Sequence, residues 1–372
     1  MFKLLALFAI VMIFAHSSAQ KDKRDLHNPD YDRKIQRDSG YIIVLLAVIL
    51  FAGLRIEYND TWNYWRALNT RYSTFDAFWA DEEMSGLLKN PAFHFYCTLI
   101  KQISVNKTLF IMPPALFTEY SIIRLLKKYS VEFDFSVYLF FTLGMYCFTL
   151  GAMKQSIAMG VLTYAITAAD KKKWIRFALL VFIAMLFHTY AVVFIIVPFL
   201  RAKPWSAFTW LMTIGAIIVF MNLEPILGNI IDASEDAGKK LYEEEILGGT
   251  GSNVFRILVY AVPPVISFIF KKQLFEDSTP SENIMVHLSI LSFACMAYGL
   301  VVAGNTSDRL ATYFEIGTFL CMPWMMKKAF DPETYNTVRG CAYAAYFIFF
   351  VYKFGIAGSF DAGYKSILSR YI

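Results

Sequence analysis

Long apolar runs separated by short polar segments dominate the sequence. A helix that crosses a bilayer needs about 20 mostly apolar residues. Nine long apolar runs occur near 107–124, 135–153, 156–169, 174–200, 205–222, 254–270, 283–303, 310–326 and 338–356. Two shorter runs, 2–16 and 41–54, lie near the N-terminus. The pattern predicts an all-α, polytopic integral membrane protein with about 11–12 transmembrane helices.

We expect a single membrane domain over residues 1–372, with a polar linker at 20–40, a core at 41–356 and a C-terminal tail at 357–372. Residues 1–19 resemble a signal peptide, because Lys3 and an apolar stretch precede Ser17-Ser18-Ala19. However, segment 21–37 is rich in Lys and Arg, which favours the cytoplasm. We therefore expect 1–19 to be an uncleaved first helix, with cleavage as the alternative.

Clusters of Lys and Arg predict the orientation, since cytoplasmic loops concentrate these residues. The clusters are Arg124/Lys127/Lys128, Lys171–Lys173, Arg201/Lys203, Lys271/Lys272 and Lys327/Lys328. If all of them face the cytoplasm, run 135–170 must contain two helices that meet on the outer side near 151–155. Run 174–200 must likewise turn back near His188. Each half of that run rises only about 21 Å as a helix, so these are short hairpin helices and His188 lies in the outer half of the membrane.

If all five basic clusters face the cytoplasm, segments 55–106, 223–253 and 304–309 must lie on the outer side. Residues 91–105 are apolar but too short to span, so we expect an amphipathic, interfacial or re-entrant helix there. No internal repeat is evident in the sequence, which argues against an architecture of two related halves.

The composition excludes several classes of protein. Hydrophobic residues make up 57% of the chain and charged residues 17%, whereas a soluble domain has about 25% charged residues. The five cysteines show no paired spacing, and no glycine-rich phosphate loop is present. We therefore expect no disulfide scaffold, no metal, no cofactor and no nucleic-acid partner.

Four basic side chains are expected at one level of the outer leaflet, each on a different segment: Arg55, Lys154, His188 and Arg309. A charge at membrane depth costs about 2.5–3.5 kcal/mol on insertion scales, so such residues often mark function. Each also has a structural interpretation. The two arginines could be snorkelling anchors at helix ends, Lys154 could stabilise a turn, and His188 could pack at a helix break.

Several fixed cations around an outward-facing cavity suit a polyanion such as a diphosphate. The carboxylates do not indicate a metal site. Residues 81–83 are best interpreted as a solvated acidic turn, and Glu119 and Glu315 as residues that pair with or hydrogen-bond to neighbouring helices. The aromatic loop from Trp62 to Trp79 could stack on sugar rings or form an interfacial belt, and the sequence leaves both open.

Four elements in order resemble the EpsG family, the Wzy-like polymerases of bacterial exopolysaccharide and capsule. They are Arg55 with Asp60 and Tyr64, then Lys154-Gln155-Ser156-Ile157-Ala158, then Phe187-His188-Thr189-Tyr190-Ala191, and last Arg309 with Tyr313-Phe314. The resemblance covers roughly residues 40–330. Lys154 stands where the family usually has Arg, which retains the charge but not the bidentate fork.

The resemblance implies polymerisation of undecaprenyl-diphosphate-linked repeat units on the outer face of the bacterial cytoplasmic membrane, without a metal, to make exopolysaccharide, capsule or O-antigen. Its partners would be the lipid-linked oligosaccharides, the lipid bilayer and other polysaccharide export or assembly proteins. Binding of the diphosphate or the sugar would fall to Arg55, Lys154, Gln155, Arg309, Tyr64 and Tyr313. The general base would be His188 or Asp60.

Two other functions stay open from the sequence. A transporter or flippase of lipid-linked oligosaccharide would also have many helices and buried cations, but it usually shows two related halves. A membrane-bound O-acyltransferase would rest on His188, but its thioester donor would have to arrive from the cytoplasm. Analysis of the lipid-linked saccharides in a deletion strain discriminates among the three.

Overall fold

The computed structural model describes residues 1–21, 38–70, 72, 74–215, 218, 254–300, 306–358 and 360–370. Most of the expected polar linker and the whole of the expected outer segment 223–253 lie outside these residues. The chain forms two compact units. Unit 1 comprises Met1–Val192 and Thr337–Ile372, and unit 2 comprises Val193–Asn336.

Unit 1 begins with the helices α1 (Phe2–Gln20) and α2 (Ser39–Gly53) and the strand β1 (Arg55–Glu57), followed by α3 (Thr61–Thr70), α4 (Phe75–Ala80), α5 (Glu82–Ser85) and α6 (Pro91–Ile103). Its longer helices are α7 (Lys107–Tyr129), α8 (Phe133–Thr142), α9 (Met145–Gly151), α10 (Met153–Asp170) and α11 (Trp174–Phe187). Near the C-terminus it has most of α19 (Pro332–Val351), the π-helix η2 (Tyr352–Ile356), α20 (Phe360–Gly363), β2 (Lys365–Ser366) and the 3-10 helix η3 (Ile367–Arg370).

The 3-10 helix η1 (Thr189–Arg201) leads from unit 1 into unit 2. Unit 2 continues with a helix at 207–215 and with α14 (Val254–Ile269), α15 (Lys271–Phe275), α16 (Pro280–Tyr298), α17 (Thr306–Phe314) and α18 (Ile316–Ala329). Where they are described, the apolar runs of the sequence are helical. Run 310–326 is interrupted at Glu315 between α17 and α18, and run 135–153 is interrupted at 143–144 between α8 and α9.

The lengths and compositions of the helices are those of an all-α membrane protein. Among the described residues, α1 and α7 are each long and apolar enough to cross a membrane. The pair α8 and α9 passes the same test together and is bent by 56° at its break. The shorter apolar helices α2, α11, η1 and α14 contain 10–17 residues each. The structure thus supports two or three spans directly, and the remaining spans stay predictions from the sequence.

Side-chain caps explain where the best-defined helices begin. The Asn106 side chain accepts hydrogen bonds from the backbone N–H groups of Thr108 and Leu109 at the start of α7. Thr279 and Glu282 form a reciprocal capping box at the start of α16. These caps satisfy amide groups that have no partner within the helix, and they therefore define where the preceding loops end.

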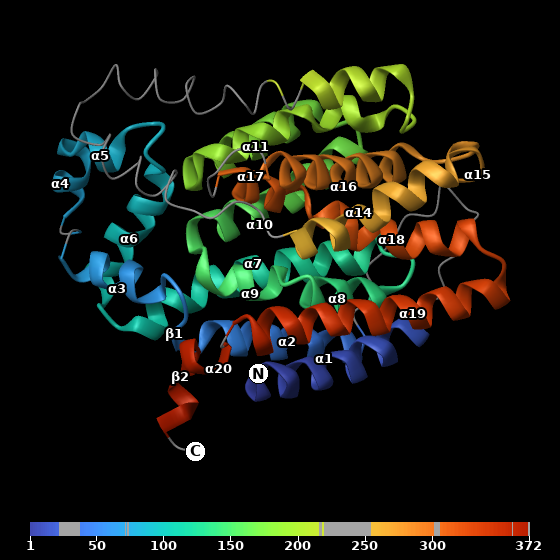
Figure 1. Cartoon of the computed structure of the whole chain (residues 1–372). Helices are drawn as coiled ribbons and strands as arrows, with labels where there is room; N and C mark the ends of the chain where they lie inside the picture. The colour runs from blue at the N-terminus through green and yellow to red at the C-terminus, as the bar shows by residue number, and fades with distance from the viewer. Residues whose placement is uncertain are drawn as a thin grey trace. The chain divides into compact units, whose positions relative to one another are not determined.

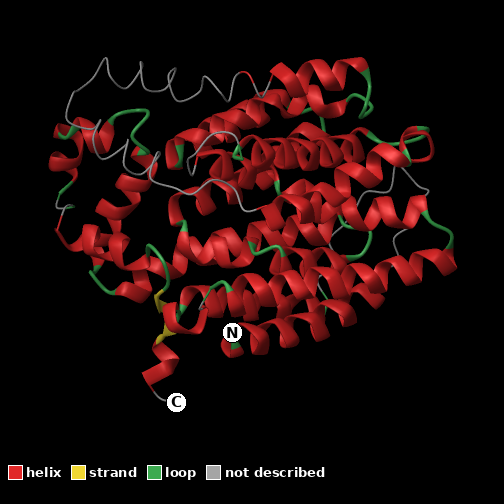
Figure 2. Cartoon of the chain, viewed as in Figure 1, coloured by secondary structure: helices red, strands yellow, loops and turns green. Residues whose placement is uncertain are grey.

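A short cap of helices lies at one end of unit 1. In Figure 1 the strand β1 and the helices α3 to α6 gather at one end of α7 and α10. Strand β1 pairs with β2 in an antiparallel register that places Arg55 opposite Ser366 (Figure 2). The end of the chain is therefore built into this cap.

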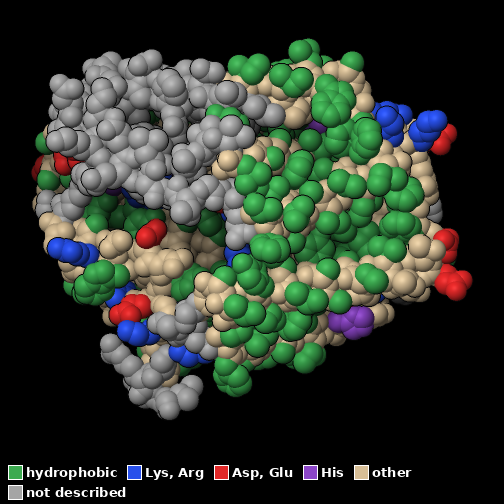
Figure 3. All heavy atoms as spheres, in the orientation of Figure 1, with side chains coloured by type: hydrophobic (Ala, Val, Ile, Leu, Met, Phe, Trp, Pro, Cys, Tyr) green, Lys and Arg blue, Asp and Glu red, His purple; other side chains and the backbone are tan. Residues whose placement is uncertain are grey.

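Apolar side chains are also abundant on the surface. Figure 3 shows a broad apolar area on the face drawn, with Lys, Arg, Asp and Glu side chains towards its edges. More than half of the side-chain surface is exposed at four apolar residues: Ile13 of α1, Leu46 of α2, and Leu258 and Ile269 of α14. A surface of this kind suits hydrocarbon better than water.

Candidate functional site

Strand β1 holds Arg55 in the interior of unit 1. Its side chain is 2% exposed, so it does not extend into solvent as a snorkelling anchor would. Its Nε donates to Thr61 Oγ1 over 3.4 Å. Its charge also interacts with the carboxylate of Glu119 on α7. A buried guanidinium needs such partners, because taking a charge out of water is costly.

The Glu119 carboxylate joins two helices beneath Arg55. It is 1% exposed, and its Oε1 accepts a hydrogen bond of 2.6 Å from the hydroxyl of Thr149 on α9. The expectation that Glu119 bonds to a neighbouring helix is therefore confirmed. Glu119 thus interacts both with the charge of Arg55 and with α9, the helix that precedes α10 and Lys154.

Phe93, in the first turn of α6, lies between two of the candidate residues. The Lys154 ammonium on α10 is 5.2 Å from the centroid of its ring. The ring of Tyr64 on α3 meets the same ring edge-on, with centroids 5.5 Å apart. Phe93 itself is 2% exposed. The structure thus brings Lys154 and Tyr64 together at the start of the helix expected at 91–105.

The chain around His188 is attached to the same place. Helix α11 ends at Phe187, and the backbone N–H of Thr189 donates to Asn90 Oδ1 over 3.0 Å. The Thr189 hydroxyl donates to the carbonyl of Leu88 over 2.8 Å. Asn90 precedes α6 in the left-handed conformation, with φ at 60°. His188 therefore lies at a helix break whose backbone is bonded to the start of α6.

The turn before α3 packs against the junction of α9 and α10. Asp60 is exposed there, and Asn59 before it has a φ of 43°. A Cβ at Gly151 would lie 3.0 Å from Asn59 Nδ2, so the absence of a side chain at Gly151 permits this approach. Gln155 follows on α10 with its side chain 3% exposed.

Unit 2 carries the remaining two candidates on α17. Arg309 is partly buried, and Tyr313 is 2% exposed. The helix ends before Glu315, whose Oε1 lies 2.5 Å from Arg256 Nη2 and whose Oε2 accepts from the Tyr260 hydroxyl over 2.6 Å. Pairing of Glu315 with a neighbouring helix is therefore confirmed.

Arg256 is the residue that the sequence analysis missed. It is on α14, and its second arm pairs with Asp308 at 3.0 Å. The signal was present in the sequence, because Arg256 is a single cation inside the apolar run 254–270. The criterion that selected Arg55 and Arg309 selects it as well.

Comparison with known proteins decides the family. The model of the EpsG family matches residues 40–365, which is most of the chain. The chain belongs to the EpsG family. The resemblance predicted from the four sequence elements is therefore confirmed. No curated protein and no solved structure matches the chain.

Membership of the EpsG family implies a Wzy-like polysaccharide polymerase, and hence a membrane protein of the glycosyltransferase kind. The matched range reaches past the expected core at 41–356 and ends at Lys365, the first residue of β2. The strand β1 that carries Arg55 thus lies within the part of the chain that matches the family.

Aromatic side chains of this EpsG-family protein present ring surface beside the cap. Trp62 is 48% exposed and Trp79 is 66% exposed. The Lys107 ammonium lies over both Trp62 and Trp65, at 5.0 and 4.5 Å from the ring centroids. In the nearby acidic turn, the Asp81 side chain accepts from the backbone N–H of Glu83 and caps α5. Within the described ranges, no group of three His, Cys, Asp or Glu side chains is arranged to hold a metal ion.

Proposed function

We propose that this protein joins oligosaccharide repeat units carried on undecaprenyl diphosphate, on the outer face of the bacterial cytoplasmic membrane. The product would be an exopolysaccharide or capsule. One observation carries the proposal: candidate residues from α3, α10 and the end of α11 gather around the start of α6, in a chain of the EpsG family.

In the proposed reaction, a sugar hydroxyl of the incoming lipid-linked repeat attacks the anomeric carbon of the growing chain. The bond between that carbon and the diphosphate oxygen breaks as the new glycosidic bond forms. The hydroxyl proton goes to His188 or Asp60 as general base. Undecaprenyl diphosphate leaves with the electron pair of the broken bond.

Protein cations supply the stabilisation of the leaving group in this proposal. Negative charge grows on the diphosphate as the bond breaks, so fixed cations nearby lower the transition state more than the ground state. Lys154 and Arg55 have this role in unit 1, and Arg309 has it by its place in the family motif. Gln155, Tyr64 and Tyr313 orient phosphate or sugar oxygens.

The geometry around Lys154 supports its part in this scheme. An ammonium beside the face of Phe93 is partly removed from water. In such surroundings a charge interacts more strongly with an anion than it does in bulk solvent. The buried Arg55 on β1 is a second positive charge within the same cap.

The proposal is tested by deleting the gene in its source organism and analysing the lipid-linked saccharides. We expect single repeat units to accumulate on the outer leaflet and long polymer to be lost. Accumulation on the cytoplasmic leaflet would instead indicate a flippase. Unchanged polymer that lacks only acyl groups would indicate an acyltransferase and would contradict the proposal.

A further inference from the structure

Arg256 on α14 bridges two carboxylates that flank α17. Its Nη1 lies 3.0 Å from Asp308 Oδ2 and its Nη2 lies 2.5 Å from Glu315 Oε1. The Arg256 side chain is 17% exposed and that of Glu315 is 2% exposed, so the second pair is shielded from solvent. Tyr260, one turn further along α14, donates its hydroxyl to the other oxygen of Glu315 over 2.6 Å.

The two carboxylates lie on one face of α17. Asp308 and Glu315 are seven residues apart, and Glu315 has helical backbone angles, so they differ by only about 20° around the helix axis. Arg309 and Tyr313 are four residues apart and share the neighbouring face, which is turned by about 100°. Arg256 therefore contacts α17 along the face that Asp308 and Glu315 share.

Helix α17 needs tertiary contacts of this kind because it is short. It contains nine residues, and isolated helices of that length are marginal. Beyond it, α18 is held closely against α16, since a Cβ at Gly317 would lie 2.4 Å from the carbonyl oxygen of Met285. The pairs with Arg256 extend this anchoring to the first turn of α17.

Arg256 also offsets negative charge near Arg309. Asp308 and Glu315 together oppose the charge of Arg309, and one guanidinium compensates for one of these carboxylates. Only Arg can pair with two separate carboxylates through two arms of a planar fork, whereas Lys carries a point charge. The geometry is therefore specific for Arg at this position.

We propose that Arg256 is a positioning residue, which holds α17 so that Arg309 and Tyr313 can bind the diphosphate of the lipid-linked substrate. The inference rests on the proposed function. It concerns a residue outside the four elements that characterise the sequence.

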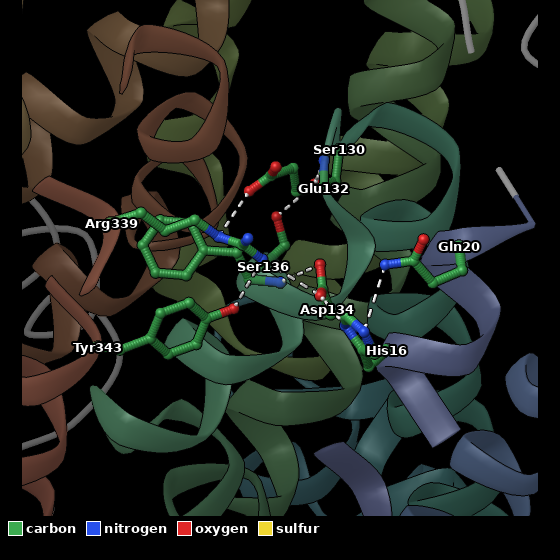
Figure 4. Close-up of polar contacts among 9 residues, drawn as sticks. His16, Gln20, Ser130, Glu132, Asp134, Ser136, Arg339 and Tyr343 are labelled. Carbon is green, nitrogen blue, oxygen red and sulfur yellow. Dashed lines mark hydrogen bonds and ion pairs between the residues drawn. The ribbon is translucent and has the colours of Figure 1, made fainter. Parts of the chain in front are cut away.

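A matched control exists in unit 1. Arg339 on α19 makes the same kind of bridge, with Nε 3.3 Å from Glu132 Oε2 and Nη2 3.4 Å from Asp134 Oδ2 (Figure 4). Its partner Tyr343, four residues later, accepts from Nη2 over 3.3 Å. Arg339→Lys thus removes a comparable fork on α19, a helix that carries no candidate residue.

The experiment compares Arg256→Lys with Arg339→Lys in the full-length protein, reconstituted in nanodiscs. Undecaprenyl diphosphate is the binding probe, and polymer per molecule of protein is measured in the complemented deletion strain. We expect Arg256→Lys to weaken probe binding about tenfold and to lower the polymer, while its unfolding temperature stays close to that of Arg339→Lys. Arg339→Lys should leave both binding and polymer unchanged.

Three results would overturn the inference in different ways. Unchanged binding and polymer in Arg256→Lys, with both lost in Arg309→Ala, would reject Arg256 alone. Equal losses in the two Lys variants, in proportion to lowered unfolding temperatures, would show a merely structural bridge. Normal polymer in Arg309→Ala would reject the role of Arg309 in the proposed function, and the role of Arg256 with it.

Discussion

Lys365 and Glu57 form an ion pair across the two strands of the cap, with 2.6 Å between Nζ and Oε2. The hydrogen bond from Lys365 holds the pKa of the Glu57 carboxyl below its ordinary value. The pair connects a residue near the C-terminus to the strand that begins with Arg55. The end of the chain is therefore a structural component of the candidate site.

We expect the buried ring next to this pair to matter more than the pair itself. Tyr364 is 2% exposed, and its hydroxyl donates to the carbonyl of Phe51 over 2.7 Å. Tyr364→Ala should therefore cost about 3–5 kcal/mol of stability, as for other large buried aromatics. Both side chains of the ion pair are substantially exposed, so Lys365→Ala should cost no more than about 1 kcal/mol.

Thermal unfolding of the two variants in detergent, together with the polymer that they make, checks this ranking. Tyr364→Phe is the control, because it retains the ring and removes only the hydroxyl. If Lys365→Ala were as damaging as Tyr364→Ala, the exposed pair would be the main attachment of the tail, and the prediction would be wrong.

The hydroxyl of Thr149 is expected to stabilise unit 1 through Glu119. Thr149→Val retains the shape but leaves the buried Oε1 without its donor, which should cost about 1–3 kcal/mol. Thr149→Ser retains the hydroxyl and should be close to the natural protein. The free energy of unfolding of both variants can be compared in detergent. Similar values for Val and Ser would show that the hydrogen bond contributes little.

Periodicity and loop charge predicted much of this fold. The apolar runs correspond to helices wherever they are described. A break next to His188 is expected because run 174–200 has a basic cluster at each end, and a run that begins and ends at the cytoplasmic side must turn back. The EpsG family, predicted from four short elements of the sequence, is confirmed by the family match. The sequence is sufficient to predict the helices and their breaks, because the length of an apolar run and the charge of the adjacent loops can be read from consecutive residues.

Long-range pairing explains what the sequence did not predict. Strands β1 and β2 have three and two residues, too few to show an alternating pattern. The pairing of Arg256 could not be predicted, because its two carboxylate partners lie 52 and 59 residues further along the chain. The interruption at Glu315 likewise coincides with contacts from α14 to its side chain, and these contacts exist only in the folded chain.

Lys154 should be required for polymer through its charge. Lys154→Met removes the cation beside Phe93 and should lower the rate about 100-fold, the usual cost of losing one preorganised group that stabilises developing negative charge. Lys154→Arg restores the charge, and the family usually has Arg here, so it should stay within about tenfold of the natural rate. The measurement is polymer per molecule of protein in the complemented deletion strain.

Lys107→Met is the matched control for this test, since Lys107 also lies over aromatic rings of the cap. We expect it to leave the rate within about threefold of normal, as a cation over exposed rings contributes only modestly. Equal rates in Lys154→Met and the natural protein would remove Lys154 from the site.

The first helix is expected to remain in the mature protein. The Lys127 ammonium, fully buried at the end of α7, donates to Ser18 Oγ over 2.8 Å and lies 3.5 Å from Asp38 Oδ2. Cleavage after Ala19 would remove Ser18 and leave a buried cation with one partner fewer. The intact mass of the protein from membranes should therefore include residues 2–19, and a mass that lacks them would contradict this prediction.

The same network predicts a difference between two adjacent lysines. Lys127→Met would leave Asp38 and Ser18 without their buried partner, which should cost about 3–5 kcal/mol. Lys128 is partly exposed beside the ring of Tyr129, so Lys128→Met should change the stability by less than about 1 kcal/mol. Thermal unfolding in detergent separates the two variants, and equal effects would argue against the buried network.

The choice between His188 and Asp60 as general base can be made with paired variants. His188 lies at the end of α11, where the following residue is bonded to the start of α6, whereas Asp60 is exposed in a turn. We favour His188, because a base held by its surroundings can stay in line with the acceptor hydroxyl. His188→Ala should then lower the rate by about 10²–10⁴, the range typical of general-base catalysis.

Asp60→Asn serves as the comparison, since it retains the size and hydrogen-bonding capacity of the side chain. We expect it to lower the rate by less than about tenfold. A loss of about 10²–10⁴ in Asp60→Asn, with a rate close to normal in His188→Ala, would assign the base to Asp60.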